Sequence, residues 1–172
     1  KKIIEEIDPF QKMEILIGSG FIEKIQNNRL IGNRLNRGNK PSITHDIKSN
    51  QFFHMMVKNK INHPDWKLKA KLNNEWLIKS HSSFGGQKVW SNFNQDNLTE
   101  EIYFQKIIIG QHISIQFLVE KDKTKILCYC EQHFLQEGSR PFIIRGITTI
   151  SLKEKIKRQM ISITEKISKF YS

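Results

Sequence analysis

The chain has 172 residues, of which 38% are hydrophobic and 26% are charged, the balance of a water-soluble globular domain with its own core. No apolar run approaches the roughly 18 residues of a membrane-spanning helix, and acidic residues near the start exclude a signal peptide, so we expect a cytoplasmic protein. The net charge of +11 permits nucleic acid, an acidic membrane surface or an anionic substrate as partner, but the lysines are scattered and form no RNA-recognition motif.

The first part of the chain predicts two short strands followed by a helix. Residues 13–21 are typical of a buried strand that runs into a glycine turn, and residues 29–33 indicate a second strand. Residues 49–60 predict an amphipathic helix with Ser49 as its N-cap. Pro64 is expected to end this helix, because proline keeps the residue before it out of the helical conformation.

The middle of the chain predicts strands. Alternating apolar and basic residues over 66–72 predict a strand with a basic outer face, and the apolar run 75–80 predicts another. A largely apolar strand is expected over residues 101–109, and two further strands that begin near His112 and Lys125 should form an antiparallel hairpin.

The end of the chain predicts a helix over residues 151–171, with an apolar stripe toward the core and with Ser151 and Glu154 placed to form a capping box. Together these elements predict a mixed α+β protein with antiparallel strands.

Two cysteines, Cys128 and Cys130, are separated by one residue and therefore fall on the same face of a strand. Neighbouring positions on one strand are poor disulfide partners, and two ligands do not make a zinc site. We interpret both as small apolar residues in a reducing compartment.

The stretch WLIKSHSSFGGQKVW, from Trp76 to Trp90, carries residue types that suit a phosphate site. Lys79 ends an apolar run, where a compact ammonium group can meet phosphate oxygens. The loop after it contains small residues whose backbone N–H groups can approach a phosphate and whose hydroxyls add donors, namely Ser82, Ser83, Gly85 and Gly86. The order G-x-x-x-x-G-K-[ST] of a P-loop is absent, and a plain hairpin beside a lysine is the alternative.

The order of these segments resembles the ATP-grasp superfamily. The matching pieces are NKPSITHDIKSNQFFHMMVKNKINHPD, EWLIKSHSSFGGQKV, EEIYFQKIIIGQHISIQFLV and KILCYCEQ, and the resemblance covers about Leu30 to Ile150. Within the superfamily the chain is similar to the branch that contains biotin carboxylase, the carbamoyl-phosphate synthetase large chain and carboligase-like proteins. The resemblance implies an α+β ATP-grasp fold over residues 39–172, in which two subdomains grip ATP between antiparallel sheets, and a remnant of an N-terminal α/β lobe over residues 1–38.

The resemblance also implies roles at the phosphate end of the nucleotide. Lys79 looks like a family lysine that contacts the phosphates, and Lys48 resembles the other ATP-contacting lysine, although it also suits an exposed position at a helix start. The lid loop over the β- and γ-phosphates would be formed by Ser82, Ser83, Gly85 and Gly86. A Gly-Gly loop suits a lid that closes over a ligand.

At the adenine end, the resemblance matches a hinge segment to Gln105, Lys106, Ile107 and Ile108. The backbone of Lys106 and Ile108 would hydrogen-bond the adenine edge while Ile107 packs, although the isoleucines also suit an ordinary core. His112 falls where relatives place a polar group near the ribose, and a purely structural histidine is the alternative.

The family's magnesium carboxylates lie mainly after the final helix, so we expect the Mg²⁺ ligands beyond residue 172 and the sequence to be part of a longer protein. No metal ligand and no catalytic residue is assigned within the chain, and the expected ligands are ATP with Mg²⁺. Without that metal, phosphoryl transfer loses a large electrostatic contribution, so this stretch alone is expected to be inactive.

The function that the resemblance implies is ATP-dependent ligation. The enzyme would activate an unidentified carboxylate as an acyl phosphate for attack by an amine or a similar nucleophile, and it could assemble as a homodimer. The alternative is a basic nucleic-acid-binding or scaffold module, supported by the charge of +11 and by the tryptophans Trp66, Trp76 and Trp90 as stacking surfaces.

Overall fold

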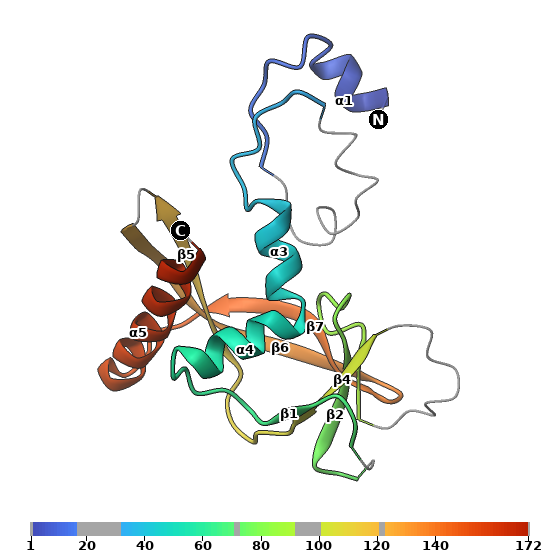
Figure 1. The fold of residues 1–172 in the computed structure, drawn as a ribbon, viewed down its shortest axis with the longest axis vertical. Coiled ribbons are helices and arrows are strands. Elements are labelled where there is room, and N and C mark those ends of the chain that lie inside the picture. Colours follow the sequence, from blue (N-terminus) through green and yellow to red (C-terminus); the bar gives the residue numbers. More distant parts are fainter. Residues whose placement is uncertain (1, 17–31, 71–72, 92–100, 121–122, 172) are drawn as a thin grey trace. The chain divides into compact units, whose positions relative to one another are not determined.

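The structure is a computed structural model that describes residues 2–16, 32–70, 73–91, 101–120 and 123–171 (Figure 1). The chain divides into two compact units, Lys1–His54 and Met55–Ser172, and each unit is described by itself. The boundary after residue 38 and the α/β character of residues 1–38 stay predictions.

The first unit contains short helices and one bridge between extended segments. Helix α1 spans Lys2–Ile7 and α3 spans Pro41–Ile47. Ile15 and Asn36 form an isolated parallel β-bridge, and Leu16 beside it is 80% exposed. The prediction of a buried strand over residues 13–21 is therefore wrong for the part that the structure describes, and residues 17–21 lie outside it.

A buried ion pair links two segments of the first unit. Arg34 Nε lies 2.8 Å from Asp8 Oδ2, and both side chains are buried. Gly32, with φ of +62°, and Asn33 form a turn directly before Arg34. The second predicted strand, residues 29–33, is thus a turn in its described part, because a left-handed glycine reverses the chain there.

Helix α4 spans Asn50–Lys58, close to the predicted range. Ser49 caps it as predicted, since its Oγ accepts a hydrogen bond of 3.2 Å from the backbone N–H two residues on. The chain leaves the helix after Lys58. Lys60 is left-handed (φ +52°), and the N–H of buried Ile61 donates to a carbonyl five residues earlier. This is a Schellman motif with lysine in the usual glycine position, so Pro64 does not end the helix.

The second unit contains a four-stranded antiparallel sheet. Its strands are β1 (Trp66–Lys67), β2 (Trp76–Ser80), β3 (Val89–Trp90) and β4 (Ile102–Lys106), in the spatial order β1-β4-β2-β3. The strands predicted over 66–72 and 101–109 are shorter than expected. Leu68 is 56% exposed just after β1, and Ile109 is 97% exposed after β4, so these apolar side chains are not buried in a sheet as the pattern predicted.

Alternation along β2 gives this sheet two different faces. Trp76 and Ile78 point to one face, where they pack with Phe104 as the core of the unit. Leu77 and Lys79 point to the other face, which borders a cavity. Because both faces are covered, nearly the whole of β2 is buried, and a single lysine can stand among apolar neighbours.

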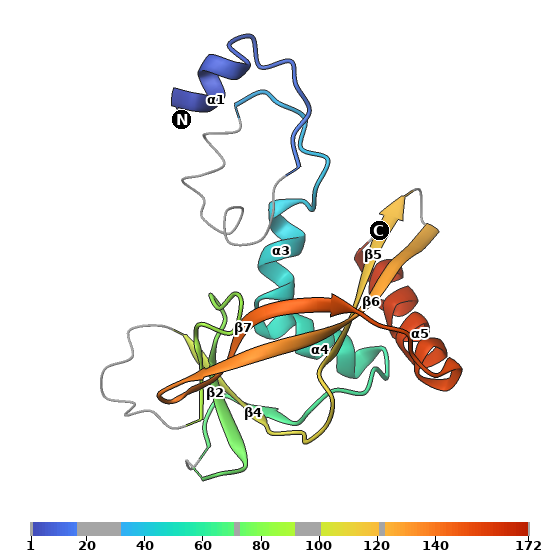
Figure 2. The same ribbon diagram turned by 180° about the vertical axis from the view of Figure 1, so that it is seen from behind.

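The second sheet has three long antiparallel strands, β5 (Ile113–Glu120), β6 (Lys123–Glu137) and β7 (Arg140–Thr149), in the order β5-β6-β7. The predicted hairpin of β5 and β6 is confirmed. Figure 2 shows β6 and β7 reaching from the neighbourhood of α5 to the four-stranded sheet. The two sheets meet where β3 lies beside β7, and Ser91 N–H donates to the carbonyl of Ser139 at 2.9 Å.

Helix α5 spans Glu154–Tyr171 and packs against β5 and β6. The predicted capping box is wrong, because Glu154 is the first residue of the helix and Ser151 lies too far ahead to cap it. The most buried residues of α5 are Thr164 and Ser168, whose hydroxyls each donate to a carbonyl four residues earlier at 2.8 Å. The hydroxyls are thereby satisfied inside the helix, which permits their burial.

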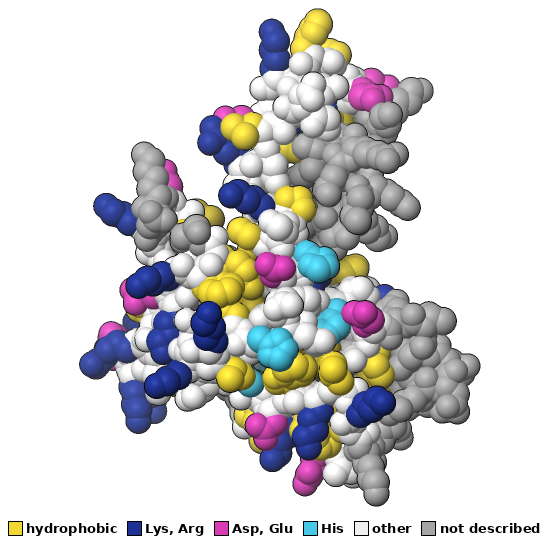
Figure 3. Space-filling model, viewed as in Figure 1, with side chains coloured by type: hydrophobic (Ala, Val, Ile, Leu, Met, Phe, Trp, Pro, Cys, Tyr) yellow, Lys and Arg dark blue, Asp and Glu magenta, His cyan; other side chains and the backbone are white. Residues whose placement is uncertain are grey.

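The surface carries basic side chains in an uneven distribution. Figure 3 shows Lys and Arg most densely over α5, with others spread singly over the rest of that face. Among the described residues, no helix has the length and apolar character needed to cross a membrane.

Candidate functional site

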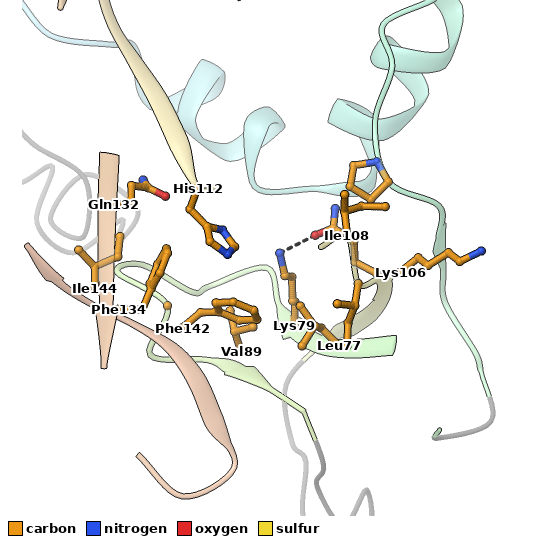
Figure 4. Close-up of a pocket in the computed structure, with 14 residues that line it drawn as sticks. Leu77, Lys79, Val89, Lys106, Ile108, His112, Gln132, Phe134, Phe142 and Ile144 are labelled. Carbon is orange, nitrogen blue, oxygen red and sulfur yellow. Dashed lines mark hydrogen bonds between the residues drawn. The ribbon is translucent and has the colours of Figure 1, made fainter. Parts of the chain in front are cut away.

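A cavity of about 370 Å³ lies between the two sheets of the second unit (Figure 4). One wall is the face of β2 and β4 that points away from the core. The other wall comes from β6 and β7, and the glycine loop before β3 and the segment after β4 complete the lining. Its volume falls at the lower end of the range for small-molecule sites.

Lys79 supplies the charge of this cavity. Its Nζ donates to Gln105 Oε1 at 2.5 Å, the dashed line in Figure 4. Burial lowers the pKa of Lys79 below its ordinary value. Lys106 also lines the cavity, but its ammonium lies 3.9 Å from Asp65 Oδ2 and points away from Lys79 in Figure 4. No carboxylate is among the described residues that line the cavity, so Lys79 has no anionic partner in it.

The end of β4 and the residues after it present backbone groups to the same cavity. The N–H of Lys106 donates to the carbonyl of Asp65, and the N–H of Ile107 donates to the carbonyl of Glu75, both at 2.8 Å. These two bonds fix the segment on the sheet. Within the described part of the chain, the Lys106 carbonyl and the Ile108 N–H make no hydrogen bond to the protein. An acceptor and a donor two residues apart are therefore available for a ligand.

Aromatic rings form the opposite wall. The ring of His112 lies edge-on to Phe134, with centroids 4.8 Å apart, and its centroid is 5.4 Å from that of Phe142. Gln132, two residues before Phe134 on β6, also lines the cavity, and its N–H donates to the carbonyl of His112 at 2.9 Å. Figure 4 shows the His112 ring directed toward the space between these rings and Lys79. Imidazole, amide and ring faces thus border the same space.

The glycine loop lies against β7. The N–H of Ile144 donates to the carbonyl of Gly85 at 2.9 Å. Gly86 has φ of +76°, and a Cβ atom at this position would lie 1.7 Å from the carbonyl oxygen of Phe142. Only glycine fits there, for two reasons. A side chain would collide with the backbone of β7, and the positive φ is unfavourable for any other residue. The loop is therefore docked on β7 in this structure, with Gly86 facing the cavity.

The two serines of the loop, Ser82 and Ser83, form hydrogen bonds inside the loop. Ser83 Oγ accepts a hydrogen bond of 3.2 Å from the N–H of Lys88, and Ser82 Oγ accepts one of 2.9 Å from the Lys88 ammonium. Ser80 Oγ lies 2.9 Å from Ser82 Oγ and accepts a hydrogen bond from the N–H of Ser82. The hydroxyls of Ser82 and Ser83 therefore stabilise the loop between β2 and β3.

Most of the predicted site residues meet at this cavity. The residues that line it are Lys79, Gly86, Gln105, Lys106, Ile107, Ile108 and His112. Ser82, Ser83 and Gly85 belong to the loop but not to the lining, and their contact with phosphate stays a prediction. Lys48 is the C-cap residue of α3 in the first unit, and its role at the nucleotide likewise stays a prediction.

Sequence reasoning missed one wall of the cavity. Gln132, Phe134, Phe142 and Ile144 line it from β6 and β7. Gln132 and Phe134 alternate with exposed neighbours along β6, which would have placed them on one face. The pattern does not tell which element that face meets, because the approach of β7 to β3 depends on contacts between residues distant in sequence.

A metal site is not furnished by the described residues, because they contain no group of three or more His, Cys, Asp or Glu side chains that could hold an ion. We therefore assign no Mg²⁺ ligand among the described residues.

Comparison with known proteins places this geometry in a family. A family model described as an ATP-grasp domain matches residues 47–171. An ATP-grasp superfamily protein from Archaeoglobus fulgidus has a similar structure, with a TM-score of 0.64 and 14% identity over 98% of this chain and 54% of that chain. An L-amino acid ligase from Bacillus licheniformis has a TM-score of 0.60 and 12% identity over 98% of this chain and 44% of that chain. No curated protein matches the sequence.

The chain thus spans about half the length of the solved structures that it resembles. Its antiparallel sheets, with the cavity between them, are part of the ATP-grasp fold, as the sequence resemblance implied. The family match covers more than half of the chain and includes every residue that lines the cavity, and the chain belongs to the ATP-grasp family.

Proposed function

We propose that this chain provides the nucleotide-binding part of an ATP-dependent ligase. The observation that carries the proposal is Lys79, a half-buried lysine in a cavity whose described lining contains no carboxylate. Holding a cation that has no anionic partner partly out of water costs free energy, and an anionic ligand offsets that cost. A triphosphate meets this requirement better than a neutral ligand does.

The adenine ring would lie at the segment after β4. The Watson–Crick edge of adenine offers an N–H donor and a ring-nitrogen acceptor side by side. The Lys106 carbonyl and the Ile108 N–H, neither bonded within the described part of the chain, match that pair. Apolar side chains that line the same space, Leu77 and Ile107 among them, would cover the faces of the ring.

The phosphates would lie toward Lys79 and the glycine loop. Gly86 brings the backbone of the loop to the cavity without a side chain in the way. His112 and Gln132 would then face the ribose, between the two ends of the nucleotide. Lys48, Ser82, Ser83 and Gly85 are proposed as further phosphate contacts on the strength of the sequence resemblance.

The reaction we propose is activation of a carboxylate as an acyl phosphate, which an amine or a similar nucleophile then attacks. Phosphoryl transfer needs little covalent help, so these residues would contribute positioning and charge stabilisation. The family match and the likeness to an L-amino acid ligase support a ligase. Placement in the branch with biotin carboxylase and the carbamoyl-phosphate synthetase large chain rests on the sequence resemblance. Magnesium, when bound, would neutralise phosphate charge.

Thermal unfolding with and without Mg-ATP tests the proposal. Ligand at about 100 times its dissociation constant adds about 2.7 kcal/mol to the stability of the folded chain. For a chain of this size the midpoint should rise by roughly 5–10 °C. Lys79→Met should abolish the rise, while Lys69→Met, which removes an exposed lysine outside the cavity, should leave it unchanged.

The unliganded variant provides the control for folding. Lys79→Met replaces a half-buried charge by an apolar side chain of similar length, so its unfolding free energy without ATP should be unchanged or higher by about 1 kcal/mol. A midpoint that rises equally in the wild-type chain and in Lys79→Met would contradict the assignment of Lys79. No rise in either chain, with the unliganded midpoint intact, would contradict nucleotide binding by these residues.

A further inference from the structure

The two cysteines of the chain lie together on β6. The Sγ atoms of Cys128 and Cys130 are 3.6 Å apart, and both thiols are free. Cys128 is half-buried, so small reagents can reach its sulfur, whereas Cys130 is only 2% exposed. Burial, together with the hydrogen bond to Cys128, raises the pKa of the Cys130 thiol. The pair thus combines an accessible thiol with a buried one at contact distance.

The surroundings of the pair fit thiol chemistry better than metal binding. Gln116 lies directly opposite Cys128 on β5, and its Oε1 is 3.5 Å from Cys128 Sγ. Cys130 has Ser114 and Thr149 as its neighbours across the two ladders. Among the described residues no His, Asp or Glu joins the two thiols to form a group of three metal ligands.

We propose that Cys128 and Cys130 are a redox-sensitive modification site that closes into a disulfide when the protein meets a peroxide. The Cys128 sulfur attacks a peroxide oxygen, the O–O bond breaks, and Cys128 becomes a sulfenic acid as one water leaves. The Cys130 sulfur then attacks the Cys128 sulfur, the S–O bond breaks, and a second water leaves. Two thiols lose two electrons, and hydrogen peroxide is reduced to two waters.

Strand β6 can change its conformation beside Cys128. Two residues along a regular strand are about 6.6 Å apart at Cα, near the upper limit for a disulfide. The register of β6 shifts between its pairings with Gln116 and Phe117, so Leu127 is an extra residue beside Cys128. Such a bulge bends a strand and interrupts its ladder. Cys128 can therefore move toward Cys130, and the resulting disulfide is strained and readily reduced, as regulatory disulfides are.

Closure of the disulfide would act on the cavity along the same strand. Cys128, Cys130, Gln132 and Phe134 alternate onto one face of β6, and the last two line the cavity. Drawing the sulfurs together shortens this stretch and displaces Gln132, whose N–H also bonds to His112. We therefore expect the oxidised chain to bind nucleotide more weakly. This second part rests on the proposed function, whereas disulfide formation does not.

Thiol labelling tests the site itself. After mild treatment with hydrogen peroxide, the unfolded wild-type chain should take up no iodoacetamide and should be lighter by two hydrogen atoms in its intact mass. Dithiothreitol should restore two labels. In Cys130→Ser, dimedone should trap a sulfenic acid at Cys128, whereas Cys128→Ser should keep its buried thiol. Two labels after peroxide, or oxidation of Cys128 to a sulfinic acid without a disulfide, would overturn the proposal.

Nucleotide affinity of the same samples tests the connection to the cavity. Peroxide should weaken the binding of a fluorescent ATP analogue several-fold in the wild-type chain, reversibly with dithiothreitol, and should leave Cys128→Ser unchanged. A disulfide that forms without any change in affinity would overturn the proposed effect on the cavity, but it would still support the modification site. If the reduced chain binds no nucleotide, the proposed function fails, and the labelling result still decides the disulfide.

Discussion

Lys79 carries the function proposed for this chain, because it is a half-buried cation in a cavity whose described lining contains no carboxylate. Burial lowers the pKa of Lys79 below its ordinary value of 10.5. The protonated form is the one that attracts phosphate, so affinity for ATP should be full below the lowered pKa and should fall as the pH rises through it. Lys79→Arg keeps its charge at every accessible pH, and its affinity should stay flat between about pH 7 and 10.

Titration with a fluorescent ATP analogue across that pH range measures the effect. The ratio of the wild-type affinity to that of Lys79→Arg removes changes that both proteins share, such as titration of other lysines. A ratio that stays constant up to about pH 10 would show that Lys79 remains protonated over this range, against the lowered pKa. A ratio that falls below the ordinary lysine pKa would assign the titration to this residue.

At the level of single residues, the sequence predicts the charged side of the site better than its aromatic side. Lys79 stands out because a lysine follows an apolar run directly before a serine and glycine loop, whereas Gln105 to Ile108 are assigned only through the family resemblance. His112 could be named as a candidate. Phe134 and Phe142 could not be named as candidates, because the sequence pattern of an aromatic residue on a strand is the same whether it faces a core or a ligand.

The loop between β2 and β3 is an element whose two glycines have different tasks. Gly85 and Gly86 both have positive φ, but a Cβ at Gly85 would meet nothing within 4 Å, whereas one at Gly86 would strike the backbone of Phe142. Gly85→Ala should therefore cost only the left-handed conformation, about 1–2 kcal/mol. Gly86→Ala adds a collision with β7 and should cost about 2–5 kcal/mol.

Urea unfolding of the two alanine variants checks this difference, and each variant is the control for the other because the chemical change is the same. Gly86→Ala should also weaken nucleotide binding more than Gly85→Ala, since Gly86 lines the cavity. Equal losses of stability in the two variants would mean that the loop is not docked on β7 in solution.

Elements defined by local pattern were predicted well, and their ends were not. The position of β2 and the start of α4 at Ser49 follow from apolar runs and a capping side chain, both local in sequence. The end of α4 depends on Lys60 adopting a left-handed conformation. Lysine rarely adopts this conformation, and no sequence pattern predicts it here. The early ends of β1 and β4 depend on which neighbours cover them, and that is a property of the assembled sheets.

At the scale of the whole molecule, the charge of +11 is the feature most open to a second interpretation. Two of the three tryptophans do not support stacking on nucleic acid, because Trp76 is in the core and Trp90 packs against the same cluster. Lys67 is turned onto the ring of Trp76, with Nζ 4.8 Å from its centroid. The basic side chains instead gather on the exposed side of α5 (Figure 3), where they are interrupted by Glu154 and Glu165.

ATP in the cavity and RNA on α5 should respond to different changes. A single-stranded RNA held by four phosphate contacts should lose about 50-fold in affinity between about 50 and 200 mM salt, because counterions are released on binding. ATP, held through one half-buried lysine and backbone groups, should lose less than about tenfold. Exchanging Lys166 and Lys169 for glutamate should weaken RNA binding and spare ATP, and Lys79→Met should do the reverse. If Lys79→Met weakened both ligands equally, ATP and RNA would share one site, and the cavity would be an electrostatic surface instead of a nucleotide pocket.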